Sequence, residues 1–284
     1  MGGLRYVEHR LRPELQPYVE CLWLASDPRA RPRAPERVVP DGCPELILHL
    51  LDRFARQRGG RFVVQPRAFL AGTLTQPWLL RAGRRVLTFG VHFRPGAVTA
   101  LLPVSMPEAT DRETRLAAIV GTAAATALGR ALRTARSETS RFAAVEEWLV
   151  GRLASARSRR GDGASAGVRL VLESRGACRI DDVARALGWT RRRLERTFTR
   201  ELGIRPKLFA RIVRLNAVLA VLDAAERASA VDMALAAGSF DQAHLLRDFR
   251  GLAGRPPGAG RELDGELARH FTHPERLRLL FAGE

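Results

Sequence analysis

Residues 180–206 constrain the fold more than any other part of this chain, because they follow two short helical patterns separated by a glycine. Three apolar residues lie on one face of the first expected helix, namely Val183, Ala184 and Leu187. Gly188 stands where the chain must turn, since glycine alone adopts positive φ without strain. Thr190 then provides a good N-cap for a second helix.

The second expected helix has an apolar and a polar face. The inner face carries residues spaced by four positions, namely Leu194, Phe198 and Leu202. The opposite face carries Arg192, Glu195, Arg196 and Thr199. Two short helices joined in this way form the helix-turn-helix layout, whose second helix enters the major groove of DNA.

The same pattern occurs twice in the chain. Ala184, Leu187 and Gly188 are matched 50 residues later by Ala234, Ala237 and Gly238. A second set is matched 51 residues later, where Leu194, Arg196, Phe198, Gly203 and Pro206 correspond to Leu245, Arg247, Phe249, Gly254 and Pro257. One unit alone also fits an αα-hairpin in a helical bundle, but an internal repeat with an arginine on each polar face favours two DNA-reading units.

The net charge favours a polyanionic partner without locating its surface. The 284 residues carry a formal charge of +17, as nucleic-acid-binding proteins often do. Lys207 is the only lysine, so the excess is arginine, a bias that is common in GC-rich genomes and is spread along the chain. A chain of this length is long enough for two domains.

Cysteine usage and apolar runs indicate a cytoplasmic protein. Cys21, Cys43 and Cys178 are odd in number and widely spaced, which fits neither a disulfide framework nor a zinc site. The amino terminus lacks the apolar region of a signal peptide, and no apolar run approaches the roughly 18 residues of a membrane span. We therefore expect a reducing environment and no membrane partner.

The first 110 residues are typical of short strands separated by turns, which favours an antiparallel barrel or sandwich. The expected strands are 18–24, 45–51, 62–64, 68–71, 78–80 and 86–93, with a surface loop at 27–37 and a hairpin turn at 56–61. Helices are expected at 114–134 and 138–157, where they complete the first domain or form a dimer seam. Residues 158–167 are the clearest linker.

A longer helix is expected to join the two repeat units, after a shorter helix at 167–174. Its residues 207–222 carry one apolar stripe, namely Leu208, Ile212, Leu215, Leu219 and Leu222. At about 1.5 Å per residue this rod spans roughly 24 Å. It is suited to holding two reading helices about one DNA turn, roughly 34 Å, apart, so that both enter successive major grooves.

Residues 168–262 resemble the DNA-binding domain of the AraC/XylS family of bacterial transcription regulators. The first half of the family pattern appears as Ile180, Ala184, Leu187, Gly188, Leu194, Arg196, Phe198, Gly203–Pro206 and Phe209. The second half appears as Ala234, Gly238, Asp241–Leu245, Arg247, Phe249, Gly254 and Pro257. The amino-terminal part more loosely resembles a cupin-like, poorly characterised domain found ahead of this module, through Pro40–Gly42, Glu45–Ile47 and Gly90–Gly96.

The second unit departs from the family pattern at three places. Ala230 replaces a large aliphatic residue, Ser239 stands where an aromatic usually follows the glycine, and Gly260 replaces an aromatic after Pro257. We therefore expect the second unit to be less stable than the first, or less deeply engaged with DNA.

The resemblance directs three residues of the first reading helix toward base edges, namely Arg192, Glu195 and Arg196. Arginine pairs bidentately with guanine and glutamate accepts from cytosine N4, so a preference for G·C pairs is a hypothesis. The alternative for Glu195 is a salt bridge that holds Arg191 or Arg192 in position. Arg191 and Arg193 are expected to meet phosphates or solvent, beside the N-cap Thr190.

The second reading helix is expected to present Gln242, Ala243, Leu246 and Arg247 outward. Gln242 is suited to reading adenine, whereas Ala243 and Leu246 can only touch thymine methyl groups. His244 is expected to contact a phosphate or to cap the helix locally.

We therefore predict an α+β protein with an antiparallel, cupin-like barrel and flanking helices, followed by an all-α domain. The predicted divisions are a sensory or dimerisation domain at 1–157, a linker at 158–167, a DNA-binding domain at 168–262 and a tail at 263–284. The predicted function is a non-enzymatic, sequence-specific transcription regulator that binds double-stranded DNA. RNA polymerase, a small-molecule effector and a second copy of the chain are candidate further partners.

No metal and no cofactor are predicted. The residues His9, His49, His92, Glu45 and Cys43 suggest a cupin metal site, but no His-x-His pair is present and strand histidines are commonly core residues. The aromatic residues Trp23, Trp78, Phe89 and Phe93 line either a pocket or a plain core. Two other classes stay as alternatives: a metal-dependent cupin-type enzyme fused to the DNA-binding module, and a basic architectural or RNA-binding protein.

Overall fold

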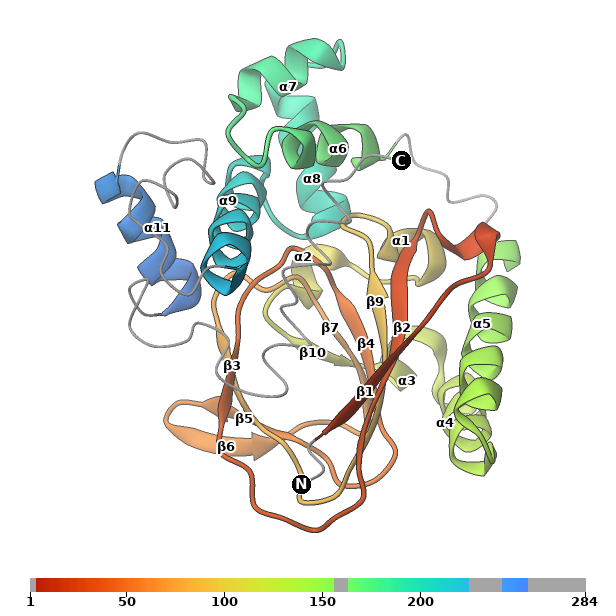
Figure 1. Ribbon diagram of the computed structural model, residues 1–284. Coiled ribbons are helices and arrows are strands. Elements are labelled where there is room, and N and C mark those ends of the chain that lie inside the picture. The colour runs from red at the N-terminus through yellow and green to blue at the C-terminus, as the bar shows by residue number, and fades with distance from the viewer. Residues whose placement is uncertain (1–3, 156–162, 225–241, 255–284) are drawn as a thin grey trace.

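The computed structural model describes residues 4–155, 163–224 and 242–254, with a β-rich part followed by a helical part (Figure 1). The described strands form two sheets in which every pairing is antiparallel. This is the predicted α+β class with the β-rich part first. No helix among the described residues combines the length and the apolar character that a membrane crossing requires.

The larger sheet has six strands in the order β1-β2-β9-β4-β7-β10. They are β1 (Arg5–His9), β2 (Val19–Asp27), β9 (Val86–Phe93), β4 (Glu45–His49), β7 (Ala68–Ala71) and β10 (Glu113–Arg115). The predicted strand at 86–93 is confirmed as β9, which pairs with both β2 and β4. In this register Glu45 lies opposite His92, so the loop that precedes β4 folds over the end of β9.

The smaller sheet has the order β3-β8-β5-β6, and its strands are β3 (Glu36–Val38), β8 (Trp78–Arg81), β5 (Ala55–Arg58) and β6 (Arg61–Val64). The hairpin turn predicted at 56–61 is too long, because only Gly59 and Gly60 form it. Their φ angles are +52° and +78°. A two-residue turn with positive φ at both positions matches the twist of its strands, so pairing continues to Arg58 and resumes at Arg61.

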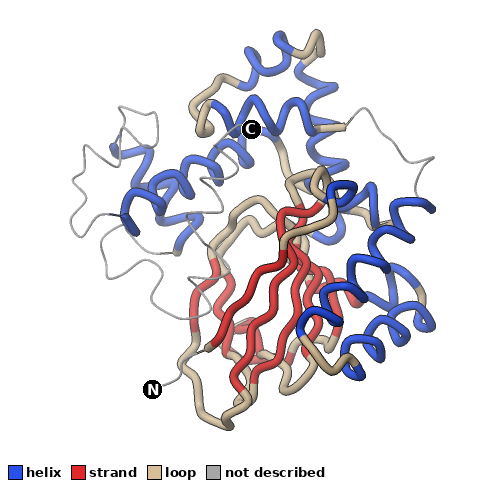
Figure 2. The backbone as a smooth tube through the Cα atoms, turned by 45° about the vertical axis from the view of Figure 1, so that its right-hand side comes forward, coloured by secondary structure: helices blue, strands red, loops and turns tan. Residues whose placement is uncertain are grey.

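Helices α4 (Thr122–Thr134) and α5 (Glu138–Ser155) share a core with the six-stranded sheet and lie beside it (Figures 1 and 2). This core contains helix residues and strand residues together, namely Leu132, Phe142, Leu149, Leu22, Leu46, Phe89 and Val91. The predicted helix at 114–134 is wrong in part, because 113–115 form β10 and Gly121, with φ +85°, separates α3 (Leu116–Val120) from α4. Short helices elsewhere in this part are η1 (Pro13–Leu15), α1 (Val98–Leu101) and α2 (Met106–Ala109).

The helical part confirms the predicted helices at 167–174 and 207–222. Its described helices are α6 (Ser165–Glu173), α7 (Ile180–Ala186), α8 (Arg191–Leu202), α9 (Pro206–Ala224) and α11 (Gln242–Ala253). Ile212, Leu215 and Leu219 of α9 are buried in one cluster with α8 and α11. The first helix of the second repeat unit, with Ala230 and Ser239, lies outside the described residues, as do Gly260 and the tail.

The aromatic residues singled out in the strands are core residues. Trp23, Trp78, Phe89 and Phe93 are each at most 3 % exposed. His49 is also buried, with Nδ1 3.1 Å from Thr88 Oγ1 and Nε2 3.3 Å from Gln65 Oε1. Burial lowers the pKa of His49 to about 3, and the bond to Gln65 offsets this only in part. His49 is therefore a neutral core histidine.

We predict that His49 makes the protein less stable as the pH falls. In the unfolded chain its imidazole binds a proton below about pH 6.5, whereas the folded protein binds it only near pH 3. Across that window each pH unit lost costs up to about 1.4 kcal/mol. Denaturant unfolding of the wild type and of His49→Gln between pH 7 and pH 4 measures this pH dependence of the free energy of unfolding. The stability difference between them should shrink as the pH falls; a constant difference contradicts the assignment.

Candidate nucleic-acid interface

Helices α7 and α8 form the first predicted helix-turn-helix unit. Gly188 has φ +64° in the turn, the conformation expected of it from the sequence. The Thr190 hydroxyl accepts a hydrogen bond from the Arg193 backbone N–H at 3.2 Å, so Thr190 is the N-cap of α8. The sequence therefore fixes both the turn and the start of the reading helix.

The inner face of α8 is buried as its spacing predicts. Leu194, Phe198 and Leu202 are fully buried, in one cluster with Val183 and Ala184 of α7. The ring of Phe198 meets that of Phe209 on α9 edge to face, with centroids 5.9 Å apart. This packing leaves the opposite face of α8 to solvent.

Two arginines on the outer face of α8 are held by neighbours. Arg191 Nε donates to Glu195 Oε1 at 3.0 Å, and its Nη1 lies 3.2 Å from Asp181 Oδ1. The Glu195 bond and the two carboxylates raise the pKa of Arg191. Arg193 stacks over Trp189, with its guanidinium carbon 4.4 Å from the ring centroid. The salt bridge weighed as an alternative for Glu195 is thus present, and its partner is Arg191.

Arg192 and Arg196 differ from these neighbours. Both side chains are exposed, and neither guanidinium forms a hydrogen bond or an ion pair with any residue that the structure describes. They lie one helical turn apart, in the first half of α8, the part of a recognition helix that contacts base edges. Two free guanidiniums in that place are suited to bidentate pairing with guanine.

The second reading helix is described in part. The backbone of α11 begins at Gln242, but the side chains of Gln242, Ala243, His244 and Leu246 lie outside the described residues. The Arg247 side chain is exposed. Phe249 and Leu252 are buried against α9, and Asp248 accepts from Arg211 Nε at 2.9 Å. These contacts fasten the second half of α11 to the long helix.

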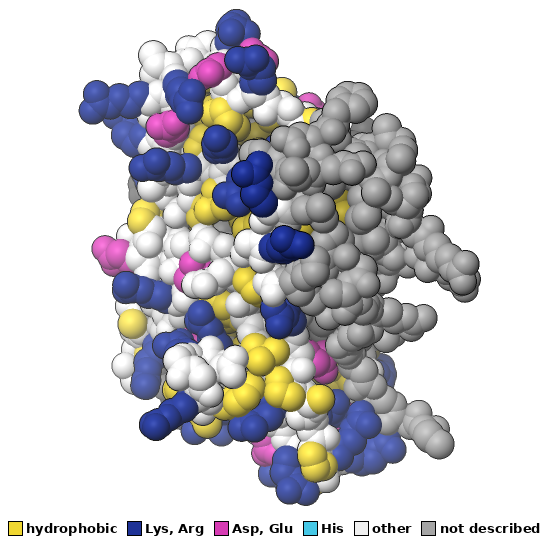
Figure 3. Space-filling view, turned by 90° about the vertical axis from the view of Figure 1, so that its left-hand side faces the viewer, with side chains coloured by type: hydrophobic (Ala, Val, Ile, Leu, Met, Phe, Trp, Pro, Cys, Tyr) yellow, Lys and Arg dark blue, Asp and Glu magenta, His cyan; other side chains and the backbone are white. Residues whose placement is uncertain are grey.

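On the face drawn in Figure 3, the basic side chains of the described residues do not gather in one patch. Figure 3 shows Lys and Arg side chains over both parts of the molecule, with Asp and Glu between them near the helical end. On this face, charge density therefore does not mark out the interface, and the helices of the motif locate it instead.

Two family models match the chain. One describes a helix-turn-helix domain and matches residues 183–262, and the other is DUF6597, a domain of unknown function, which matches residues 8–115. The carboxy-terminal part is an AraC-type helix-turn-helix domain. This domain binds double-stranded DNA and makes the chain a DNA-binding transcription regulator. No curated protein matches the sequence.

Solved structures of ToxT from Vibrio cholerae resemble this regulator over most of both chains. A 1.65 Å structure of ToxT is 7 % identical, covers 92 % of this chain and 98 % of that chain, and gives a TM-score of 0.43. Wild-type ToxT with bound unsaturated fatty acid, from strain SCE256, is 10 % identical, covers 90 % and 95 %, and gives 0.42.

The carboxyl end of α8 is anchored on the β-rich part. The buried Thr73 hydroxyl donates to the Leu202 carbonyl at 2.6 Å, and the Thr110 hydroxyl lies 3.2 Å from the Gly203 carbonyl. Gly203 has φ +79° and ends the helix in the left-handed conformation. A Cβ there would lie 2.1 Å from Thr110 Oγ1. The amino-terminal half of α8 points away from this anchor (Figure 1).

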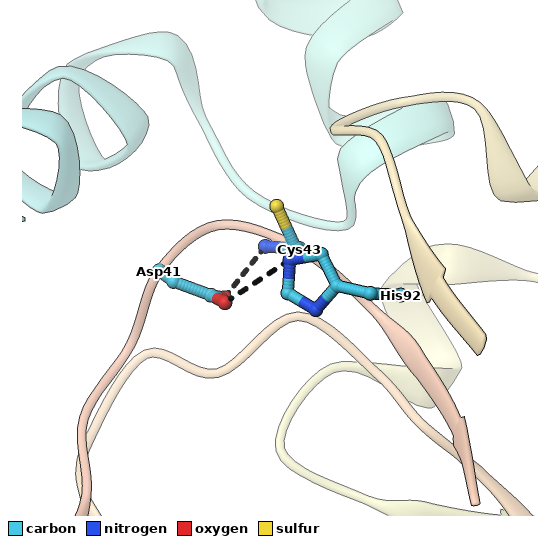
Figure 4. A group of neighbouring side chains, drawn as sticks. All are labelled: Asp41, Cys43 and His92. Atoms are coloured by element: carbon cyan, nitrogen blue, oxygen red, sulfur yellow. Dashed lines mark hydrogen bonds and ion pairs between the residues drawn. The ribbon is translucent and has the colours of Figure 1, made fainter. Parts of the chain in front are cut away.

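A polar cluster lies in the β-rich part, in the region where it meets the helical part. Asp41 and Cys43, in the loop before β4, meet His92 of β9, and one ligand atom from each lies within 4.8 Å of the others (Figure 4). Burial raises the pKa of Asp41 to about 6 and that of the Cys43 thiol to about 12. Burial alone lowers the pKa of His92, but Cys43, Glu45 and Asp41 outweigh it and raise that pKa well above its usual value.

Sequence reasoning weighed Cys43, Glu45 and His92, together with His9 and His49, as a cupin metal site and then predicted no metal, and it did not single out Asp41 as a ligand. The signal that joins them is the β4–β9 pairing, which places Glu45 opposite His92 across a large sequence separation. His9 and His49 lie elsewhere, with His9 stacked on Phe142 and His49 in the core.

We predict that Gly203→Ala loosens the contact between α8 and the β-rich part. Positive φ costs an alanine about 1–2 kcal/mol, and the clash with Thr110 adds to that cost. Gly188→Ala is the matched control, since Gly188 has similar φ but open space around its Cβ. Denaturant unfolding of both variants measures the difference. Equal losses would mean that the Gly203 contact contributes nothing beyond backbone conformation.

Proposed function

We propose that this regulator reads specific duplex DNA with Arg192 and Arg196 of helix α8. The observation that carries the proposal is the contrast along one helix face. Arg191 and Arg193 are occupied by Glu195 and Trp189, whereas the two guanidiniums between and beyond them have no described partner. Arginine that is free in the first half of a recognition helix favours guanine O6 and N7.

Glu195 acts chiefly as a positioning residue in this proposal. Its carboxylate accepts from Arg191 at 3.0 Å, and Arg191 also reaches Asp181 on α7. The three residues form an ion-pair chain across the turn of the motif. Arg191 is then presented at the edge of the motif, where phosphate oxygens lie when a recognition helix enters the groove.

Helix α11 is the second reader in this proposal, with Arg247 and the residues around 242–246 toward DNA. Its Phe249 packs against α9, which fixes α11 to the same rod that follows α8. Helix α9 has 19 residues, so it spans about 28 Å at 1.5 Å per residue. A rod of that length suits two readers in successive major grooves, about 34 Å apart.

The β-rich part is proposed as the regulatory part. It contacts both the end of the first reading helix, at Leu202 and Gly203, and the long helix, at Asn216. A small molecule or a second copy of the chain that alters these contacts would alter how the two readers are held. RNA polymerase is a further proposed partner, since regulators act on promoters.

We predict that Arg196→Ala weakens binding to the preferred site by about 1–3 kcal/mol and relaxes the choice of base at one position. Selection from randomised duplexes with the full chain, followed by titration of the winning duplex and of single-base variants, measures both effects. Arg192→Ala should relax a different, neighbouring base pair.

Arg169→Ala is the matched control, because Arg169 is an exposed arginine of α6 that pairs with Glu173 and lies off the reading helix. It removes the same charge and should leave base preference intact. If Arg196→Ala weakens every duplex equally, Arg196 contacts only phosphate. If the wild type yields no consensus and its affinity follows salt alone, the chain is a sequence-independent basic protein and the proposal is wrong.

A further inference from the structure

The cluster of Asp41, Cys43 and His92 has the donor set of a metal site. Two ligands come from one loop and the third from the strand that this loop covers. A thiol, an imidazole and a carboxylate converge within 4.8 Å of one another, and Cys43 and His92 are at most 5 % exposed. Sulfur and nitrogen donors together select ions of the zinc class over calcium and magnesium.

His92 is oriented as metal-binding histidines are. Its Nδ1 lies 2.8 Å from Glu45 Oε1, while its Nε2 points toward Asp41, 3.6 Å from Oδ2 (Figure 4). Trp23 Nε1 donates to the same Glu45 oxygen at 3.1 Å, which holds the carboxylate in place. When a metal ion replaces the proton on Nε2 and Nδ1 donates to Glu45, the lone pair of Nε2 faces Asp41 and Cys43. A carboxylate behind the histidine is the usual support of a metal ligand.

The ionisable groups around His92 are acidic. Asp41 and Glu45 both approach the ring, and neither forms an ion pair with an arginine or lysine of the described chain. The two carboxylates outnumber the one imidazole that can carry a positive charge, and such an excess of negative charge in a mostly buried site is costly without a compensating cation. The Asp41 side chain is 16 % exposed, so one edge of the cluster reaches solvent.

The loop that holds two of these residues also touches helix α9. Gly42 lies between Asp41 and Cys43, and a Cβ built on it would be 2.7 Å from the Phe209 ring. The Pro40 carbonyl accepts from Asn216 Nδ2 at 2.8 Å, and Val39 belongs to the buried cluster of α8 and α9. The loop that carries Asp41 and Cys43 therefore packs directly against α9.

We propose that Asp41, Cys43 and His92 bind a divalent ion of the zinc class, and that the bound ion acts on helix α9 through residues 39–43. Glu45 is a positioning residue that orients His92. Three protein ligands leave a fourth position for water or for a ligand from solution, as in open zinc sites. The second step, control of DNA binding, rests on the proposed function; the first does not.

The first step is tested with Co²⁺ and Zn²⁺ on the full chain after treatment with a chelator. We expect one Co²⁺ per chain, with the near-ultraviolet absorption of a cobalt–thiolate bond, and displacement of that absorption by Zn²⁺. Cys43→Ser should abolish the absorption, and Asp41→Asn should weaken Zn²⁺ binding at least about tenfold. Glu45→Gln should weaken it by about 10- to 100-fold, the usual effect of losing a supporting carboxylate.

Cys178→Ser is the matched control, because Cys178 lies outside the cluster, packed beside the helical core, and this variant should keep the absorption. Circular dichroism establishes whether each variant is folded. If Cys43→Ser does not fold, Asp41→Asn takes its place as the test variant. A wild type without cobalt–thiolate absorption overturns the proposal. So does unchanged Zn²⁺ affinity in a folded Cys43→Ser. Loss of the absorption in Cys21→Ser, with retention in Cys43→Ser, would also overturn the proposal, because the thiolate ligand would then be Cys21 and not Cys43.

The second step is tested by titrating the selected duplex with and without Zn²⁺. We expect the affinity of the wild type to change at least threefold with the ion, and that of Cys43→Ser to stay constant. Zn²⁺ binding with unchanged DNA affinity would overturn the coupling and leave the metal site in place. Absence of sequence-specific binding would instead refute the proposed function, while the cobalt spectrum still decides the first step.

Discussion

The packing of Phe209 is the interaction on which the arrangement of the two parts depends. This fully buried ring lies against Phe198 of α8 on one side and against Gly42 of the β-rich part on the other. Burying such a side chain contributes about 1.5–3 kcal/mol, and only glycine leaves room for it at position 42. The buried amide of Asn216 finds its acceptor on Pro40 in the same seam. Because the reading helix, the long helix and the loop share one core, the DNA-binding domain is held by the β-rich part rather than tethered to it.

Pairing, more than net charge, determines which arginines are available to DNA. The arginine-rich loop predicted at 27–37 illustrates this, since the buried Asp27 carboxylate accepts from Arg31 Nε at 2.9 Å and from Arg33 Nη2 at 2.5 Å. Both guanidiniums are thus held by a carboxylate of the loop itself, and the Arg33 side chain is only 7 % exposed. On α8, Arg191 and Arg193 are held by Glu195 and Trp189, whereas Arg192 and Arg196 have no polar partner among the residues that the structure describes. A positive surface supplies affinity that falls with salt, whereas discrimination between bases needs a guanidinium that can align with a base edge.

Local patterns in the sequence predicted what local forces decide. The i, i+4 spacing of Leu194 and Phe198 fixed the buried face of α8, and Thr190 and Gly188 fixed its start, because caps and turns act within a few residues. The periodicity of apolar residues did not predict the break between α3 and α4 at Gly121, because the alanine-rich segments on both sides are typical of a helix. The meeting of Asp41 with His92 was beyond sequence reasoning for a different reason. It follows from the register of β4 on β9, and nothing in either segment alone specifies that register.

The position of Gly42 gives the link between the polar cluster and the DNA-binding domain a geometric basis. Asp41 and Cys43 flank it and face His92, while Gly42 itself adopts φ +88° and lies against Phe209. The loop therefore has one surface toward the cluster and another toward α9, with no residue between them to absorb a displacement. A tenfold change in DNA affinity corresponds to about 1.4 kcal/mol. That is less than the burial of one aromatic ring contributes. A ligand shifts an equilibrium between two states by the difference in its affinity for them. A ligand that binds the cluster with different affinity in two positions of the loop can thus supply a free-energy change of this size.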